Sequence, residues 1–278
     1  MKRLLLCTDL DRTIIPNGVQ LESPDAKERF DQLTNLKNVT LAYVTGRDLE
    51  LVKQAVADFE LQLPDFIIAD VGTSIYQLVN SGWQRWRNWD EQIASDWGGA
   101  DIYNLLSAFP ELHLQEKEKL GRYKLSFYVS LSVNVEALIS QIDSQLKYAG
   151  IRANSIWSID EQKGVGLLDV LPASASKLSA IQFMMQHQKF DCKNTFFAGD
   201  SGNDLDVLRS EILAILVANS TEEIKDQLAH ISPDNLYIAK GAYLGMNGNY
   251  RGGILEGLAY YLPEVDMWMQ ETKLSKGN

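Results

Sequence analysis

The sequence Thr8-Asp9-Leu10-Asp11-Arg12-Thr13 directly follows the first strongly apolar run of the chain, Leu4-Leu5-Leu6-Cys7. An apolar run without polar alternation predicts a short strand that is buried on both faces of a sheet. Ligands of open α/β sheets bind in the crevice outside the carboxyl ends of the strands, where Asp9 and Asp11 are expected. Two carboxylates so close repel each other, and a hard cation such as Mg²⁺ usually compensates them. Because such a short motif often only caps a loop, its meaning depends on the rest of the chain.

The composition of the 278-residue chain argues against several classes of partner. A formal net charge of −11 disfavours nucleic acid and anionic membranes, which require clustered Lys and Arg. The first apolar run ends after about four residues, short of the roughly seven of a signal peptide, and no run approaches the roughly twenty of a membrane-spanning helix. Cys7 and Cys192 show no metal-ligand spacing and no disulfide framework. We therefore expect a cytoplasmic protein without a nucleic-acid or membrane partner. A monomer is taken as its oligomeric state, which composition does not determine.

Strands and helices alternate on both sides of a central interruption. Six segments after the first strand predict further core strands: residues 39–44, 66–69, 167–172, 195–198, 212–217 and 235–239. Such alternation over short connections is typical of a parallel sheet with right-handed crossovers. The pattern predicts an α/β protein with a doubly wound, Rossmann-like parallel sheet.

The interruption has a different pattern. Residues 124–131 and 151–159 alternate between apolar and polar side chains, and a helix is predicted between them. Alternating strands with helices on one face predict a small α+β layer, unlike the two-sided core sheet. We expect residues 83–165 to form an inserted smaller α+β domain, and residues 1–82 and 166–278 to form the core.

Polar residues with chemical potential follow three of the predicted core strands. Asp9 and Asp11 follow the first, Thr45 follows the second, and the loop Asp200-Ser201-Gly202-Asn203-Asp204 follows a later one. Lys177 lies in the first turn of a predicted helix, where a cation opposes the helix macrodipole by up to about 1 kcal/mol. This position is unfavourable unless an anion lies nearby. Each feature alone has an ordinary structural explanation, such as a turn or a solvated side chain, but the combination is more specific than its parts.

Taken together, these features resemble the haloacid dehalogenase superfamily of phosphatases. That family has an Asp-x-Asp-x-Thr motif, a strand-terminal Thr or Ser, a Lys and a Gly-Asp-x-x-x-Asp loop in this order. The matching residues here are Asp9, Asp11, Thr13, Thr45, Lys177, Gly199, Asp200 and Asp204. The resemblance implies a magnesium-dependent phosphatase with a cap domain inserted after the third strand.

The resemblance also implies a role for each residue. Asp9 would attack phosphorus and form an aspartyl-phosphate, and Asp11 would protonate the departing alkoxide and then activate water. The implied Mg²⁺ ligands are Asp9, the backbone carbonyl of Asp11, Asp200 and, directly or through water, Asp204. The implied substrate contacts are Thr45, Gly46, Arg47, Lys124, Lys177 and Asn203.

Smaller motifs narrow the resemblance to the sucrose-phosphate phosphatase branch. They are Val71-Gly72-Thr73, Asp169-Val170-Leu171-Pro172, Asn219-Ser220 and residues 253–258. The branch implies a sugar phosphate as substrate, with sucrose 6-phosphate first and mannosylfructose phosphate or glucosylglycerol phosphate as alternatives. Lys124 would contact the sugar, although a solvated lysine explains it equally well. Arg12 departs from the pattern, in which Gly or Asn is commoner, and is expected to meet the phosphate or the cap.

Two classes of protein without phosphatase activity stay open. A phospho-accepting signalling module would keep the aspartyl-phosphate, but an acid/base such as Asp11 speeds its turnover. A catalytically silent carbohydrate-binding protein could share the fold, although the complete motif set argues against it. Four tryptophans could stack on sugar rings, but large aromatics at such spacing more often form the core of the cap. They are Trp83, Trp86, Trp89 and Trp97.

Overall fold

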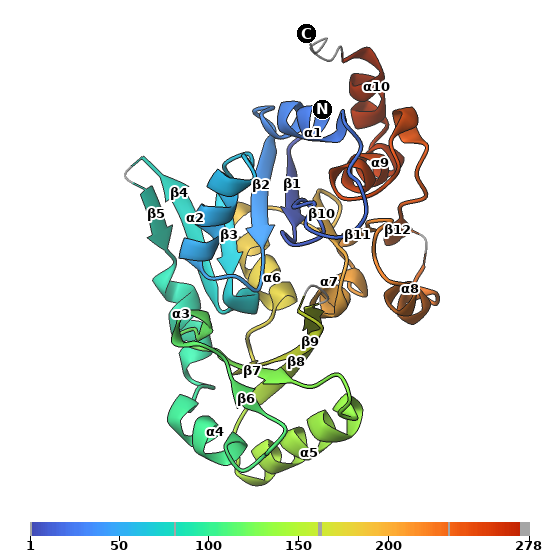
Figure 1. Ribbon diagram of the computed structural model, residues 1–278. Coiled ribbons are helices and arrows are strands. Elements are labelled where there is room, and N and C mark those ends of the chain that lie inside the picture. Colours follow the sequence, from blue (N-terminus) through green and yellow to red (C-terminus); the bar gives the residue numbers. More distant parts are fainter. Residues whose placement is uncertain (1, 81, 161–162, 233, 273–278) are drawn as a thin grey trace.

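The computed structural model describes residues 2–80, 82–160, 163–232 and 234–272. Within these residues, a large sheet of eight strands occupies the centre, and a smaller sheet of four strands lies beyond the carboxyl ends of its parallel strands (Figure 1). Helices flank both sheets, as expected of an α/β protein. No helix in this part of the chain combines the length and the apolar character that a membrane crossing demands.

The large sheet has the strand order β12-β11-β10-β1-β2-β3-β4-β5. Its strands are β1 (Leu4–Thr8), β2 (Val39–Val44), β3 (Phe66–Ala69), β4 (Ser74–Val79), β5 (Gly82–Arg85), β10 (Thr195–Gly199), β11 (Leu213–Leu216) and β12 (Leu236–Ile238). The strands from β12 to β3 are parallel to their neighbours, whereas β4 and β5 extend the sheet as an antiparallel hairpin. Ser81, which lies between the two strands of this hairpin in the sequence, is outside the described residues. The doubly wound parallel sheet is therefore confirmed, with an antiparallel edge.

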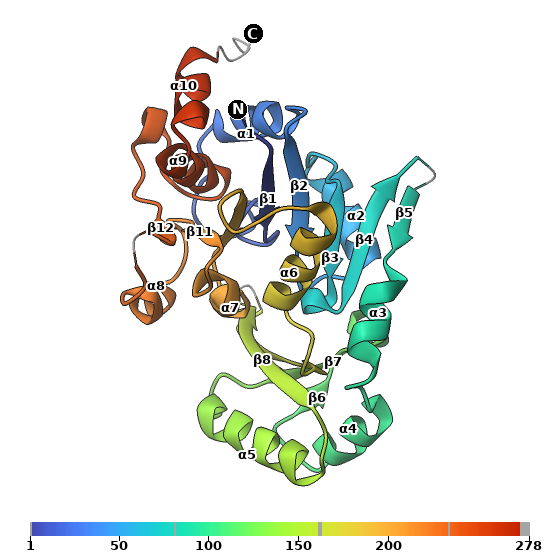
Figure 2. The ribbon, with the colours of Figure 1, turned by 180° about the vertical axis from the view of Figure 1, so that it is seen from behind.

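Helices cover both faces of the large sheet (Figures 1 and 2). One face carries α1 (Ala26–Thr34), α2 (Leu49–Asp58), α9 (Arg251–Tyr261) and α10 (Pro263–Glu271), and the other carries α6 (Lys177–Gln188), α7 (Leu205–Leu208) and α8 (Glu222–Leu228). In β1, Leu4 and Leu6 pack on the first face, while Leu5 and Cys7 pack on the second. Because successive side chains of a strand point to opposite faces, this central strand needs apolar residues at every position.

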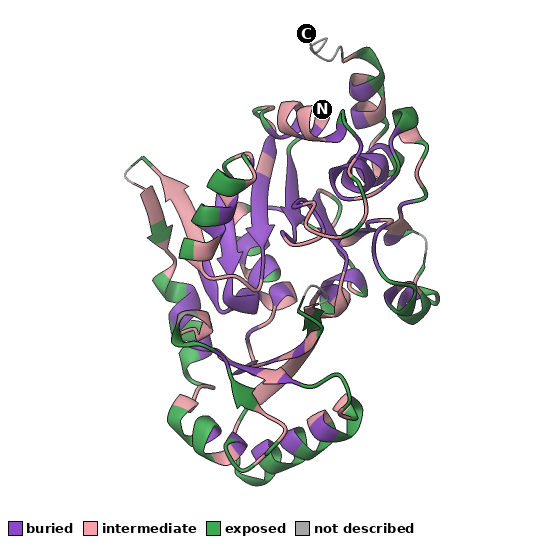
Figure 3. Ribbon diagram, viewed as in Figure 1, coloured by how far each residue is buried: buried purple, intermediate pink, exposed green. Residues whose placement is uncertain are grey.

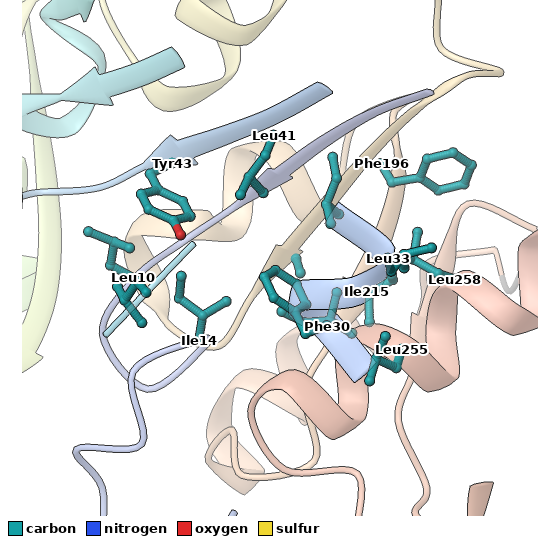
Figure 4. Packing of buried hydrophobic residues seen from close by; sticks show 14 of the residues in the cluster. Leu10, Ile14, Phe30, Leu33, Leu41, Tyr43, Phe196, Ile215, Leu255 and Leu258 are labelled. Atoms are coloured by element: carbon teal, nitrogen blue, oxygen red, sulfur yellow. The ribbon is translucent and has the colours of Figure 1, made fainter. Parts of the chain in front are cut away.

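The packing of these faces holds the strand ends in place. Figure 3 shows that burial is continuous through β1, β3 and β10 in the middle of the large sheet, whereas β5 at its edge is only partly buried. On the first face, Phe30 and Leu33 of α1 lie beside Leu255 and Leu258 of α9 (Figure 4). Each fully buried side chain of this size contributes about 1.5–3 kcal/mol relative to an exposed one. The site at the strand ends therefore rests on a rigid support.

The small sheet has the order β6-β7-β9-β8 and is antiparallel throughout. Its strands are β6 (His113–Leu114), β7 (Leu125–Val129), β8 (Ala153–Asp160) and β9 (Val165–Pro172). One face is covered by α4 (Gly99–Leu106) and α5 (Val135–Tyr148), and α3 (Arg87–Ala94) leads into this unit from β5. We call residues 87–172, from α3 to β9, the cap.

β9 corrects one prediction. The sequence predicts a core strand at residues 167–172, but β9 pairs with β7 and β8 in the small sheet. Leu168 and Val170 are buried against the cap helices, whereas the alternate residues Leu167 and Asp169 are only half-buried. Because Leu167 is apolar although it lies on the more open face, the alternation is hidden and the run looks like a two-sided strand.

The pairing of β5 and β9 also moves the boundaries of the inserted unit. β5 belongs to the large sheet, so the cap begins after it rather than at residue 83. β9 belongs to the small sheet, so the cap extends beyond residue 165. We therefore propose residues 87–172 as the inserted unit in place of residues 83–165.

Candidate active site

The carboxyl ends of β10, β1 and β2 lie side by side, because these strands are neighbours in the sheet and their register aligns them. Asp9, Thr45 and Asp200 directly follow β1, β2 and β10. Their exposed fractions are 4%, 1% and 3%. The structure thus brings three predicted site residues to one buried edge of the sheet.

Asp204 completes a cluster of three buried carboxylates, here called the carboxylate cluster, with Asp9 and Asp200. Oxygens of the three residues lie within 4.8 Å of one another. The Oδ2 atom of Asp204 accepts hydrogen bonds from the backbone N–H groups of Asp200 (3.0 Å) and Ser201 (3.1 Å). Gly199 makes room for this arrangement, since a Cβ there would lie 2.6 Å from the Asp204 carboxyl carbon. The last residue of β10 must therefore be glycine for Asp204 to reach the cluster.

Lys177 joins the carboxylate cluster from the first turn of α6. Its Nζ atom donates to the Oδ1 atoms of Asp9 (2.9 Å), Asn203 (2.8 Å) and Asp204 (2.7 Å). Burial would lower the pKa of Lys177, but the charges of Asp204 and Asp9 raise it above its ordinary value. Lys177 is therefore charged, and these carboxylates are the anions that its position in a first helical turn requires.

The carboxylates are held closer together than their charges favour. Burial raises the pKa of Asp9 to about 7, although Lys177 opposes the increase. Burial, with the nearby charges of Asp204 and Asp9, raises the pKa of Asp200 well above its usual range. A divalent cation would relieve this repulsion, and hard cations such as Mg²⁺ prefer carboxylate oxygens. The residues present therefore fit a divalent-metal site.

Asp11 is paired with Arg47. Arg47 donates from Nε to Oδ2 (2.7 Å) and from Nη2 to Oδ1 (2.6 Å) of Asp11. Asn17 donates from Nδ2 to Oδ1 of the same carboxylate (2.7 Å). Burial would raise the pKa of Asp11, but the hydrogen bonds and charge of Arg47 outweigh it and lower the pKa. Asp11 is thus ionised in this arrangement.

Lys124 connects the cap to the core. Its Nζ atom donates to the backbone carbonyl of Gly46 (3.0 Å) and lies 3.5 Å from Oδ1 of Asp70. Asp70 and Val71 lie in the turn between β3 and β4 and have φ values of 52° and 57°, in the left-handed region that favours glycine. Lys124, which is predicted to contact the sugar, is therefore bound to two groups of the core.

The cap touches the core at a second place, beside β10. A Cβ on Gly202 would lie 3.0 Å from the carbonyl oxygen of Trp157 in β8. Gly202 belongs to the loop that carries Asp204, whereas Gly46 follows β2 on the other side of β1. The cap therefore contacts the loops on both sides of the carboxylate cluster.

Two of the predicted tryptophans pack against α6. The rings of Trp86 and Trp89 lie 6.1 and 5.0 Å from the ring of Phe183, measured between centroids. Trp89 is 0% exposed and donates from Nε1 to the carbonyl of Gly72 (3.0 Å). These two side chains thus pack in a core, but it is the core beneath the large sheet and not the core of the cap that was expected, because α6 lies beside them.

Arg12, Asn17 and Asp70 extend the site beyond the predicted residues. The Nε atom of Arg12 lies 3.2 Å from Oδ2 of Asp200. Arg12 therefore contacts the carboxylate cluster, and the expected contact with the phosphate or the cap stays a prediction. Asn17 and Asp70 bind predicted residues, but nothing in the local sequence pattern marks them. Only Arg12 had a visible signal, its place between Asp11 and Thr13.

Known proteins share this fold. The solved structure of the sucrose-phosphatase from Synechocystis sp. PCC6803, in complex with sucrose and phosphate, aligns with a TM-score of 0.79 at 25% identity, over 94% of this chain and 98% of that chain. A protein of Nitrosococcus oceani described as a HAD-like hydrolase is 47% identical over 276 residues, which are 97% of this chain and 74% of that protein. Sucrose-phosphatase 2 of Nicotiana tabacum is 29% identical over 239 residues, 80% of this chain, and the chain spans only 52% of it.

The fold and the carboxylate cluster, with these relatives, define a phosphoric monoester hydrolase of the haloacid dehalogenase superfamily. Residues 2–262 match the model of one family within it, described as sucrose-6F-phosphate phosphohydrolase, and every motif from Asp9 to Asp204 lies inside the match. The chain therefore belongs to the sucrose-6F-phosphate phosphohydrolase family, which confirms the resemblance seen in the sequence.

Proposed function

We propose that this protein is a Mg²⁺-dependent phosphatase that hydrolyses sucrose 6-phosphate to sucrose and phosphate. The observation that supports it most is the contact of Lys177 with Asp9 inside the carboxylate cluster. This contact sets a fixed positive charge beside the nucleophile, where the charge of a transferring phosphoryl group needs stabilisation. The family match and the similarity to a sucrose-phosphatase solved with sucrose and phosphate support the choice of sugar.

In the proposed reaction, Asp9 attacks phosphorus, the bond from phosphorus to the sugar oxygen breaks, and an aspartyl-phosphate forms. Asp11 gives its proton to the leaving oxygen and then, as a carboxylate, takes a proton from the water that hydrolyses the intermediate. Because Arg47 lowers the pKa of Asp11, Asp11 must leave this ion pair before it can carry a proton. We propose that the incoming phosphate takes over Arg47 and so releases Asp11.

The remaining roles follow from the position of each group. The proposed cation ligands are Asp9, Asp200, Asp204 and the backbone carbonyl of Asp11. A bound Mg²⁺ would neutralise charge on the phosphate oxygens. The proposed substrate contacts are Thr45, Gly46, Arg47, Lys124, Lys177 and Asn203, with Lys124 directed to the sugar.

Phosphate release from a panel of sugar phosphates in the presence of Mg²⁺ tests this function. We expect kcat/KM for sucrose 6-phosphate to exceed that for mannosylfructose phosphate and glucosylglycerol phosphate by about tenfold or more, because a site built to bind hydroxyl groups rejects sugars that misplace them. A preference for one of the other two would change the sugar and keep the chemistry. No release from any of them, or from para-nitrophenyl phosphate, would contradict the function.

A further inference from the structure

We propose that Arg12 is a built-in counter-cation of the carboxylate cluster that weakens the binding of the divalent ion, an inference that rests on the proposed metal site. The backbone at Arg12 has a φ of 58°, in the left-handed region where Gly and Asn are favoured. Its N–H group donates to the carbonyl of Ile15 (3.1 Å) and to Oδ1 of Asn17 (2.9 Å), so the loop imposes this conformation. An arginine in a position that suits glycine points to a use for its side chain.

The guanidinium of Arg12 is fixed from two sides. Its Nε atom lies 3.2 Å from Oδ2 of Asp200, and its Nη2 atom donates to the backbone carbonyl of Asn219 (2.9 Å). Asn219 returns a hydrogen bond from Nδ2 to the carbonyl of Arg12 (2.7 Å) and accepts one from the N–H group of Tyr250 (2.8 Å). Asn219 is only 3% exposed. The positive charge is therefore held beside Asp200 and is not directed to a substrate in the cap.

Each acidic group around the site contacts a cationic side chain, and Lys177 is shared by two of them. Lys177 contacts Asp9 and Asp204. Arg47 contacts Asp11, which leaves Arg12 as the cation that contacts Asp200 in the described part of the chain. Arg12 thus compensates the one carboxylate of the cluster that Lys177 does not touch.

Arg12 has two opposing effects on a bound cation, because it orients the ligand Asp200 and also repels the cation. Partners that orient a metal ligand usually strengthen binding, and losing one weakens it about 10- to 100-fold. Asp200, however, keeps a second partner, because Thr13 donates from Oγ1 to its Oδ1 atom (3.2 Å). A full positive charge one carboxylate away from the cation repels it, and this repulsion is strong where water is excluded. We therefore expect repulsion to outweigh orientation.

Titration calorimetry with Mg²⁺ on the full-length protein measures this effect directly. Arg12→Asn removes the charge and suits the left-handed backbone, so it should fold and should lower the Kd for Mg²⁺ by about tenfold or more. The rise in Tm that saturating Mg²⁺ produces should be larger in this variant than in the parent. Arg12→Lys keeps the charge and should stay within about threefold of the parent.

Arg122→Asn is the matched control, since it removes the same charge from a side chain that is 69% exposed and paired with Asp90 in the cap. Its Kd for Mg²⁺ should equal that of the parent. Unchanged or weaker Mg²⁺ binding by Arg12→Asn would overturn the inference, and so would equal tightening in Arg12→Lys. Absence of Mg²⁺ binding by the parent and by every variant would instead overturn the metal site itself, while the sugar phosphate panel tests the hydrolysis independently.

Discussion

Asp9 is the residue on which the proposed chemistry depends. One of its oxygens is engaged by Lys177 at 2.9 Å, and its side chain is held at the end of a strand that is buried on both faces. A carboxylate fixed in this way loses little conformational entropy when it attacks, and this lowers the activation free energy of the reaction. Burial raises the pKa of Asp9, which means that the ionised carboxylate is less stable here than in water. The negative charge that the reaction requires therefore lowers the stability of the folded protein at this position.

Asp9→Asn should reduce kcat by about three orders of magnitude or more, because the amide has nearly the same shape but is a far poorer nucleophile. The variant also removes one charge from the carboxylate cluster, so its Tm should not fall by more than a few degrees. Phosphate release and thermal unfolding measure the two quantities. Substantial turnover by a folded Asp9→Asn protein would exclude Asp9 as the nucleophile.

The sequence predicts those site residues whose spacing forms a recognisable motif. Asp9, Thr45 and Asp200 were each predicted to follow a core strand, and the structure shows that these three strands are neighbours in the sheet. The partner of Arg12 could not be predicted, because its direction depends on a positive φ and on a loop that is distant in the chain. The contact between Asp70 and Lys124 could not be predicted either, because Asp70 lies in the core and Lys124 lies in the cap, far apart in the sequence.

Among the secondary-structure elements, β7 and the turn before it carry one of the two described contacts between cap and core. Lys124 immediately precedes β7 and binds the loop after β2. Gly121, at the start of the same turn, permits this approach, since a Cβ there would lie 3.3 Å from the carboxyl group of Asp70. A sugar bound between the cap and the carboxylate cluster would meet these groups first.

Lys124→Ala should lower kcat/KM for sucrose 6-phosphate by about 10- to 100-fold, the equivalent of one hydrogen bond to a charged group, and leave para-nitrophenyl phosphate nearly unaffected. It should also lower the free energy of unfolding by about 1–3 kcal/mol, because Asp70 stays buried without its partner. Lys147→Ala, which removes an exposed lysine of α5, is the control and should change neither quantity. Equal losses on both substrates would assign Lys124 to structure alone.

The elements themselves were predictable where side chains show a clear pattern. The strands β1, β2 and β3 were predicted because both of their faces are apolar. β9 was assigned to the wrong sheet, because Leu167 and Leu171 conceal its alternation. α10 was not predicted, since the segment after Pro263 has neither a strong apolar face nor a side-chain cap.

The whole protein has a net charge of −11. It would repel an anionic phosphate ester unless cations were placed at the site itself. The cations that matter are local, namely Lys177, Arg47 and the proposed metal ion. The cap lies beyond the carboxyl ends of the strands (Figure 1) and contacts loops on both sides of the carboxylate cluster. A cap in this position would exclude water and strengthen the charge interactions inside once it closed on a bound substrate.

Removal of divalent cations should therefore abolish activity, and Mg²⁺ should restore it, because the proposed ligands have to be neutralised before a phosphate dianion can approach. Ca²⁺ should compete without supporting turnover, since its longer bonds and higher coordination number would displace the nucleophile. Phosphate release in excess chelator, with Mg²⁺ or Ca²⁺ added back, measures both effects. Full activity in chelator would show that no divalent ion takes part.

The path of the chain from β9 into α6 also determines how the cap could be exchanged. β9 ends at Pro172 and α6 begins at Lys177, so a strand of the cap is followed almost directly by the lysine that holds Asp9. At this junction, a Cβ on Gly72 would lie 2.2 Å from the carbonyl oxygen of Ser176, which leaves no room for a different backbone course. A chimera that imports the cap of a relative should therefore be joined at Trp86 and Ala173 and should retain Gly72 and Ser176. Joining at residue 83 would divide β5 of the large sheet, and joining at residue 165 would separate β9 from the rest of the small sheet. Such a chimera should lose both the phosphatase activity of the core and the substrate specificity of the imported cap.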